Sequence, residues 1–334
     1  MSQDHGRPAT RPTPTPEPPR PIHVDTKPTT GTPEAHHDGG GHAPAKPAAG
    51  TGTLTLAGVS TTVTTPITFG DGNYKLVDNE ANAVITGGNG NISVTELAAG
   101  AQITLGNGNM KIEARTATVT LGTGDHRVEL GGTGNHVTVG ATNGAATDLT
   151  MIRAGNGNAT VLAGDGNMAI SAGGAGNTIT VGTGNDRIEL GGGTTAAITA
   201  NTLNLGNGTN HVFLRGSGDT INDGSGTDTI SAIGATNETF VLNAAGGNDT
   251  IAGFSTTNGD VLNLGKLLAG TGALADLTNL SSFVTLATHA DATHAAWTDT
   301  VLTIAGSGGT ATVTLLNTGT LALGDLTAAH SVSL

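Results

Sequence analysis

The sequence has no cysteine and very few aromatic residues. Its 334 residues include five Phe, one Tyr and one Trp. The absence of cysteine excludes a disulfide framework and thiolate metal sites. The scarcity of rings excludes most helix-packed enzymes, because their cores depend on large side chains. Apolar residues still make up 36% of the chain, so a core can form, but it must be built from Val, Ile, Leu and Ala.

Positive charge is also scarce, with 13 Lys and Arg against 26 Asp and Glu and a formal net charge of -13. So acidic a chain is not expected to bind nucleic acid, whereas divalent cations are compatible with it. No apolar run approaches the roughly 20 residues that span a bilayer, so we expect no membrane span. The first fifty residues also lack the apolar segment of a secretory signal peptide. We therefore expect any export to use another route.

Residues 1–50 differ in composition from the rest of the chain, since they hold 11 of the 12 prolines. The segment at residues 11–21, RPTPTPEPPRP, favours extended polyproline II geometry and offers little apolar surface to bury. We predict a disordered Pro/His-rich tether over residues 1–50. Within it, His36, His37, Asp38 and His42 could bind Zn or Cu, but a solvated linker is the favoured interpretation, because disordered His tracts rarely form a defined four-ligand site.

From residue 51 onward the sequence repeats itself. The clearest copies, GDGNYKL, GNGNISV and GNGNMKI, begin at Gly70, Gly88 and Gly106, which are 18 residues apart. Other columns keep the same step, among them Ile67, Ile85 and Ile103, and Leu76, Val94 and Ile112. Looser copies follow as far as Gly246, several of them at steps near nine. The repeat unit is therefore about nine residues long, with two units in each 18-residue coil.

Each unit joins a Gly- and Asn-rich turn to a short alternating segment, which has the period of a strand. Such short strands can bury their apolar faces only by stacking coil upon coil. We predict an all-β fold: a parallel β-solenoid, or β-roll, over residues 51–252, followed by a β-rich C-terminal region over residues 253–334. A β-sandwich is the competing fold, but it does not require an 18-residue register.

One face of the predicted solenoid is rich in threonine. Thr68, Thr86, Thr104 and Thr120 keep the same place in successive coils and should form an outward row. Such a row could bind carbohydrate, another copy of the chain or ice, although Thr is also an ordinary exposed strand residue. Uncapped terminal coils would also permit lateral or end-to-end assembly.

Several copies resemble the G-G-x-G-x-D-x-U-x nonapeptide of the repeats-in-toxin family of secreted bacterial proteins. The closest are at residues 182–188, 224–230 and 246–251. The resemblance implies a parallel β-roll that binds Ca²⁺ through aspartates and turn carbonyls. The positions that match are Asp186, Asp219, Asp228 and Asp249. In the first copies the aspartate slot holds Tyr74, Ile92 and Met110 when it is counted from the glycines, or Asn73, Asn91 and Asn109 when it is counted as the last polar residue before the strand. Either way the charged ligand is missing, so we expect calcium only at the later turns. The alternative role for these aspartates is to accept hydrogen bonds from backbone N–H groups.

Residues 238–268 are similar to the junction that precedes the C-terminal signal of type I secretion substrates. The matching pieces are Asp249, Ile251 and Phe254, followed by GDVLNL at residues 259–264. The similarity implies an extracellular or cell-surface location and the type I secretion machinery as a partner. It also suggests that low cytosolic calcium leaves the acidic coils unfolded for transport and that external calcium then closes them.

The sequence offers no catalytic constellation. It lacks the H-E-x-x-H, G-x-S-x-G and Walker motifs, and the repeats already begin at Gly70. We expect solvent-facing turn positions for His126, His136 and His211, and a local core position for Trp297. The resulting hypothesis is a secreted, non-enzymatic calcium-binding repeat protein with a structural or adhesive role at the bacterial surface or in extracellular matrix. Its further partners would be other copies of itself or a surface polysaccharide. The alternative is an accessory module of a secreted hydrolase or polysaccharide-modifying enzyme.

Overall fold

The fold is described from a computed structural model, which covers residues 22–23, 50–55, 66–142, 149–191, 200–243, 247–271, 277–291, 294, 296–328 and 332–333. Within residues 1–50 only Ile22–His23 and Gly50 are described. The predicted disorder of the tether and the candidate His36, His37, Asp38 and His42 site therefore lie outside the described residues.

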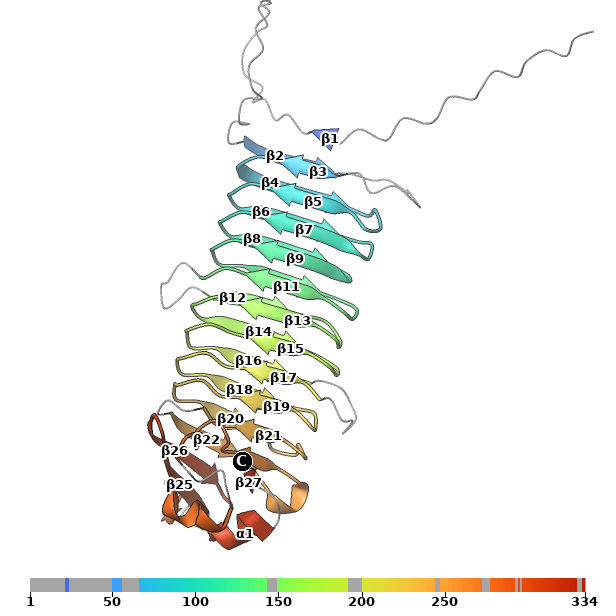
Figure 1. The fold of residues 1–334 in the computed structure, drawn as a ribbon. Coiled ribbons are helices and arrows are strands. Elements are labelled where there is room, and N and C mark those ends of the chain that lie inside the picture. The colour runs from blue at the N-terminus through green and yellow to red at the C-terminus, as the bar shows by residue number, and fades with distance from the viewer. Residues whose placement is uncertain are drawn as a thin grey trace, which may run out of the picture.

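The chain winds into a β-solenoid in which successive strands alternate between two parallel sheets (Figure 1). This confirms the predicted fold class. The 13-stranded sheet contains, in order, β1 (Ile22–His23), β3 (Ile67–Phe69), β5 (Val84–Gly87), β7 (Ala101–Leu105), β9 (Ala117–Leu121), β11 (His136–Val139), β13 (Thr160–Ala163), β15 (Thr178–Thr180), β17 (Thr202–Asn204), β19 (Thr220–Asn222), β21 (Thr239–Val241), β23 (Val261–Asn263) and β27 (Val332–Ser333). The 14-stranded sheet contains β2 (Gly50–Thr55), β4 (Gly72–Asp78), β6 (Ile92–Glu96), β8 (Met110–Ala114), β10 (Arg127–Leu130), β12 (Thr150–Arg153), β14 (Met168–Ala172), β16 (Arg187–Leu190), β18 (His211–Leu214), β20 (Thr229–Ser231), β22 (Asn248–Ala252), β26 (Gly309–Leu316), β25 (Thr298–Gly306) and β24 (Val284–Ala290).

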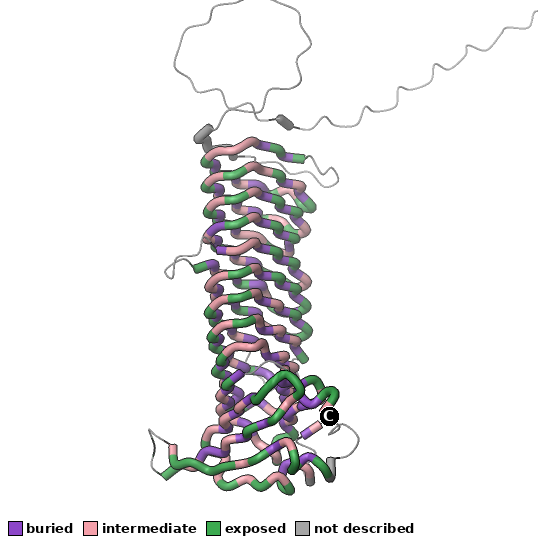
Figure 2. Tube along the Cα trace, turned by 60° about the vertical axis from the view of Figure 1, so that its left-hand side comes forward, coloured by how far each residue is buried: buried purple, intermediate pink, exposed green. Residues whose placement is uncertain are grey.

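The register is the one that the 18-residue period predicts. Ile67 pairs with Ile85, and Ile85 pairs with Ile103. In the other sheet the column of Leu76, Val94 and Ile112 is aligned in the same way. All six of these side chains are buried, and buried positions run along the inside of the coils (Figure 2). Because each coil contributes only a few aliphatic side chains, the core between the sheets is thin and regular.

The turns hold the coils at close spacing. Gly208 has φ +143, and a Cβ at this position would lie 1.7 Å from the carbonyl oxygen of Gly184 in the neighbouring coil. No other residue type fits there without moving the backbone. At the outer edge of the turns, the side-chain oxygen of Asn73 accepts the backbone N–H of Asn91 at 3.0 Å. Amide side chains therefore link the exposed turns along the axis.

The C-terminal part covers the last coils with an antiparallel meander of β24, β25 and β26, whose final strand joins β22 in parallel. The short helices are η1 (Thr256–Asn258), η3 (Leu277–Ser282) and α1 (Leu323–Ala328). No helix in the described part of the chain has the length and apolar character needed to cross a membrane. Within the junction segment, Phe254 is buried and its ring lies 6.2 Å from that of Phe240.

The prediction for Trp297 was wrong. The residue is 43% exposed rather than part of a core. Its ring stacks on the exposed imidazole of His294, with 4.1 Å between ring centroids. The ring therefore finds its partner at the surface, outside the buried core of the meander.

Candidate functional site

One column of polar side chains lies immediately before the strands of the 13-stranded sheet. From β11 to β23 its members are Asn135, Ala159, Asn177, Asn201, Asp219, Glu238 and Asp260. The polar members reach back toward the preceding coil: Asp219 Oδ1 accepts the N–H of Asn201 at 2.8 Å, and Asp260 Oδ1 accepts that of Glu238 at 3.0 Å. The side chains thus accept hydrogen bonds from buried backbone N–H groups at the bend before each strand. The hydrogen bonds between neighbouring strands do not reach these N–H groups.

A second column lies at the beginning of the strands of the 14-stranded sheet or directly before them. In its C-terminal half it contains Asp186, Asn210, Asp228 and Asp249, one in each coil. Asp186 Oδ1 accepts the N–H of Met168 at 2.8 Å. Asp228 Oδ1 accepts both the N–H of Asn210 at 3.1 Å and its side-chain amide at 2.8 Å. Asp249 Oδ1 accepts the N–H of Asp228 at 3.0 Å.

The structure thus brings three of the four predicted metal residues into one column, Asp186, Asp228 and Asp249, and leaves Asp219 in the other. All four are buried. Each also accepts a backbone N–H, which is the alternative role considered for these aspartates. A ligand role does not conflict with this, because a carboxylate offers more than one lone pair, and calcium binding at the four positions stays a prediction.

Negative charge accumulates in both columns toward the C-terminal end. In the early coils, the column of the 14-stranded sheet holds Ile92 and Met110, and the column of the 13-stranded sheet holds Ala101 and Ala117. In the later coils, both columns contain carboxylates. Burial raises the pKa of Asp186 to about 6, and burial together with the nearby Asp219 raises the pKa of Glu238 to about 8. Because a buried charge is costly, these groups favour a proton or a cation near neutral pH.

Asp223 is a buried carboxylate that the repeat pattern did not single out. Its Oδ1 accepts the N–H of Asn243 at 2.6 Å, and its carboxyl group lies near that of Asp249. Burial, followed by the charge of Asp249, raises the pKa of Asp223. Two carboxylates this close cannot both ionise without a proton or a cation between them. The available signal was the Asn222-Asp223-Gly224 turn directly ahead of a repeat copy.

Glu238 and Asp260 were also missed, although they occupy the same slot as Asp219 in later coils. Neither follows a G-x-G turn, so the nonapeptide pattern gave no signal. Their place in the column follows from the register of β21 and β23. The position directly before each strand of the 13-stranded sheet therefore predicts the place of these carboxylates better than the family motif does.

Asp223, Asp228 and Asp249 form the strongest candidate for a cation site. They supply only oxygen donors, which suits a hard cation such as Ca²⁺. Asp228 Oδ2 is buried and has no hydrogen-bond partner among the described residues, so one oxygen remains available. In the described part of the chain no three or more acidic or His side chains already converge on one ion-sized point. The residues thus fit the charge and donor chemistry of calcium, and turn carbonyls would have to complete six or more ligands.

The outward sides of the two sheets differ in charge. Outside the 13-stranded sheet, the predicted row of Thr68, Thr86, Thr104 and Thr120 is exposed, as expected. Outside the 14-stranded sheet, two neighbouring rows from Lys75 to Ser231 carry charged side chains, and we call this surface the charged face.

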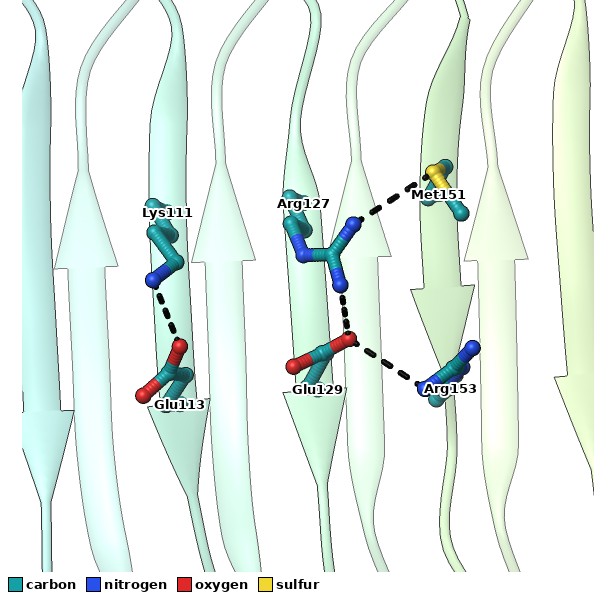
Figure 3. Close-up of polar contacts among 6 residues, drawn as sticks. All are labelled: Lys111, Glu113, Arg127, Glu129, Met151 and Arg153. Atoms are coloured by element: carbon teal, nitrogen blue, oxygen red, sulfur yellow. Dashed lines mark hydrogen bonds and ion pairs between the residues drawn. The ribbon is translucent and has the colours of Figure 1, made fainter.

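Ion pairs run along the charged face (Figure 3). Lys111 contacts Glu113 at 2.6 Å within one strand. In the next coils Glu129 lies between two arginines, at 2.5 Å from Arg127 and 3.4 Å from Arg153. These pairs are exposed, so each contributes little to stability. They do hold the arginines in place on the surface.

The repeat histidines do not all face solvent. His136 and His211 are exposed as expected, although they begin strands β11 and β18 rather than lie in turns. His126 is only 2% exposed, and its Nε2 lies 3.0 Å from the carbonyl oxygen of Gly122. The expectation for His126 was wrong because this residue occupies the inward column slot before β10. Burial lowers its pKa, which favours a neutral imidazole.

Comparison with known proteins adds no relative, since no protein-family model, no curated protein and no solved structure matches the chain.

Proposed function

We propose that the chain is a secreted, non-enzymatic calcium-binding repeat protein with a structural or adhesive role at the bacterial cell surface or in extracellular matrix. The observation that carries the proposal is the group of buried carboxylates Asp223, Asp228 and Asp249 in the last coils. At the pH of most natural waters these groups need compensation for their charge. A rigid rod with such an end is suited to mechanical and adhesive work.

Calcium would supply the positive charge and accept hard oxygen ligands. Asp223, Asp228 and Asp249 would hold it, and Asp186 and Asp219 would serve as further ligands in neighbouring coils. The aspartates already accept N–H groups of the adjacent coil through one oxygen, so ion binding and coil stacking would use the same side chains. An ion that binds only the stacked coils stabilises them by mass action.

Export fits the same linkage. Without calcium, the ionised carboxylates would weaken the last coils and keep the C-terminal part ready for the type I secretion machinery. External calcium would then close the coils. Deleting the chain from Gly246 onward should abolish export in a bacterium that carries such machinery. Export of the truncated chain at the full-length level would contradict the secretion assignment.

A second candidate function is an accessory module of a secreted hydrolase or polysaccharide-modifying enzyme. A depression on the charged face favours it, because Glu96, Glu113 and Glu129 all line this hollow. Burial raises the pKa of Glu96 to about 7, whereas the contact with Lys111 lowers that of Glu113. A proton donor and an ionised carboxylate thus share one hollow. Release of reducing ends from a polysaccharide by the purified chain would support this function over the non-enzymatic one.

Calorimetric titration of the full chain with CaCl₂ at pH 7.5 tests the calcium proposal. We expect saturable binding that is lost in the double variant Asp228→Asn/Asp249→Asn. Asp165→Asn is the matched control, because Asp165 is an exposed turn aspartate that accepts the N–H of Thr183 at 2.8 Å. Absence of binding, or equal binding by the double variant, would contradict the proposal.

A further inference from the structure

The basic residues of the folded part are concentrated on one side of the solenoid. Residues 51–334 contain eight Lys and Arg and 21 Asp and Glu. Seven of the eight basic residues lie on the charged face or in the turns that directly follow its strands: Lys75, Lys111, Arg115, Arg127, Arg153, Arg187 and Arg215. The two rows themselves project five basic side chains and three acidic ones, Glu113, Glu129 and Glu189. Asp78, Glu80 and Glu96 lie at the ends of these strands or in the turns that follow them. A strongly acidic chain thus carries one net positive stripe.

The same face is hollowed along its length. A depression of about 530 Å³ is lined by residues of β6, β8, β10 and β12 and of the turns that follow them, including Arg115 and Arg153. A second, of about 200 Å³, continues from Arg153 to Arg187. A third, of about 440 Å³, lies beyond it against Phe213 and Arg215. Arg153 lines both of the first two depressions, so the hollows follow one another along the axis. This arrangement suits an extended, linear ligand.

The arginines on this track remain available to a ligand. Arg153 is 64% exposed, and its contact with Glu129 is the longer of that residue's two, at 3.4 Å. No ion pair joins Arg115 to another residue in the described part of the chain, and Arg115 is exposed. Planar guanidinium groups bind carboxylates through two parallel hydrogen bonds. The cations also recur at intervals of one or two coils, or roughly 5–10 Å.

The glutamates on the face and its single Phe indicate which polyanion fits. Glu113, Glu129 and Glu189 can accept hydrogen bonds from hydroxyl groups, which sugars supply and a DNA backbone does not. The guanidinium of Arg187 lies over the ring of Phe213, 4.3 Å from its centroid, and Phe213 is the only Phe, Tyr or Trp in the described part of the two rows. Nucleic-acid tracks use repeated aromatic stacking and a uniformly basic groove. A sugar chain with spaced carboxylates matches the mixed charges better.

We propose that the charged face binds a linear acidic polysaccharide, a polymer of hydroxyl-rich rings that carry carboxylate groups, laid along the solenoid axis from β6 to β20. This deepens the proposed adhesive role by naming the class of partner, but it does not depend on calcium. Glu96 lines the first depression, and its Oε2 is buried without a hydrogen-bond partner among the described residues. Glu96 is only 2% exposed, so its carboxyl group lies beneath the track rather than on its surface.

The test is a binding titration of the full chain with polygalacturonate fragments of defined length, in chelator so that calcium cannot cross-link the polymer. We expect binding that weakens with added salt and falls at least about tenfold in the variant Arg115→Ala/Arg153→Ala. Lys266→Ala is the matched control, because Lys266 is the one basic residue of the folded part that lies off this face. It should bind like the unchanged chain.

Three results would overturn the proposal: neutral dextran binding as tightly as polygalacturonate, no loss in the double arginine variant, or tighter binding of single-stranded DNA than of polygalacturonate. The variant Asp228→Asn/Asp249→Asn should keep its affinity for polygalacturonate. The calcium titration and the polygalacturonate titration therefore test the two proposals independently.

Discussion

Replacement of Asp186 by asparagine should stabilise the chain at pH 8 in chelator and change little at pH 4. Burial and the nearby Asp228 raise the pKa of Asp186 from 3.8 to about 6 in the folded chain. A carboxyl whose folded pKa is raised contributes its full stability below the unfolded pKa and loses it as the pH rises through the folded pKa. The native chain should therefore lose stability between about pH 4 and pH 6.

A shift of about two pKa units corresponds to about 3 kcal/mol at pH 8 and well under 1 kcal/mol at pH 4. Asparagine has no charge to desolvate and keeps the oxygen that accepts the N–H of Met168. The neighbouring slot already holds Asn210 in the same role. We therefore expect Asp186→Asn to raise the free energy of unfolding by up to about 3 kcal/mol at pH 8.

Urea unfolding followed by far-UV circular dichroism at both pH values measures this difference. Asp165→Asn is the control, because hydrogen bonds from Thr183 lower the pKa of that exposed aspartate. The control should gain no stability at pH 8. If Asp186→Asn were neutral or destabilising at pH 8, the reasoning about buried charge in the column would be refuted.

Three further substitutions test the packing of the coils, each by urea unfolding. Asn177→Ala removes a buried amide that bridges two coils and leaves an N–H group without a partner, so the free energy of unfolding should fall by about 2–3 kcal/mol. The control Asn73→Ala, at an exposed position, should lower it by less than about 1 kcal/mol. Gly208→Ala should lower the free energy of unfolding by more than about 2 kcal/mol, because Gly208 has a φ of +143 and an added Cβ would clash with the neighbouring coil. Its control, Gly131→Ala, has open space around the added Cβ and should be nearly neutral. Ile112→Ala should cost about 3 kcal/mol, since this side chain is fully buried, and a loss below about 1 kcal/mol would contradict the packed core.

The coil architecture could be predicted because its signal is local and repeated. Stacked coils place similar residues at equivalent positions. The spacing of Ile67, Ile85 and Ile103 therefore indicates both the length of the repeat and the side of the strand that faces the core. The outward Thr row followed from the same register. In a solenoid, the sequence period gives the strand register directly.

The candidate site was harder to predict because longer coils shift the register. Asn177 and Asn201 are neighbours in one column although 24 residues separate them. Beyond such a step, motif spacing no longer shows which aspartates share a column. Asp223 and Glu238 were missed for a different reason, because neither follows the G-x-G turn that marks the earlier aspartates. The positive stripe depends on strands brought together from distant coils, although the alternation of Lys111 with Glu113 and of Arg127 with Glu129 gave a local hint.

Hydrogen exchange of the full chain, compared in chelator and in millimolar calcium at pH 7.5, tests whether calcium holds the last coils together. Calcium should protect backbone amides in residues 200–263, where the carboxylates of the two columns gather. Residues 66–142 should exchange equally slowly in both conditions, because aliphatic and amide columns hold these coils without an ion. Identical exchange of residues 200–263 with and without calcium would contradict this role of calcium.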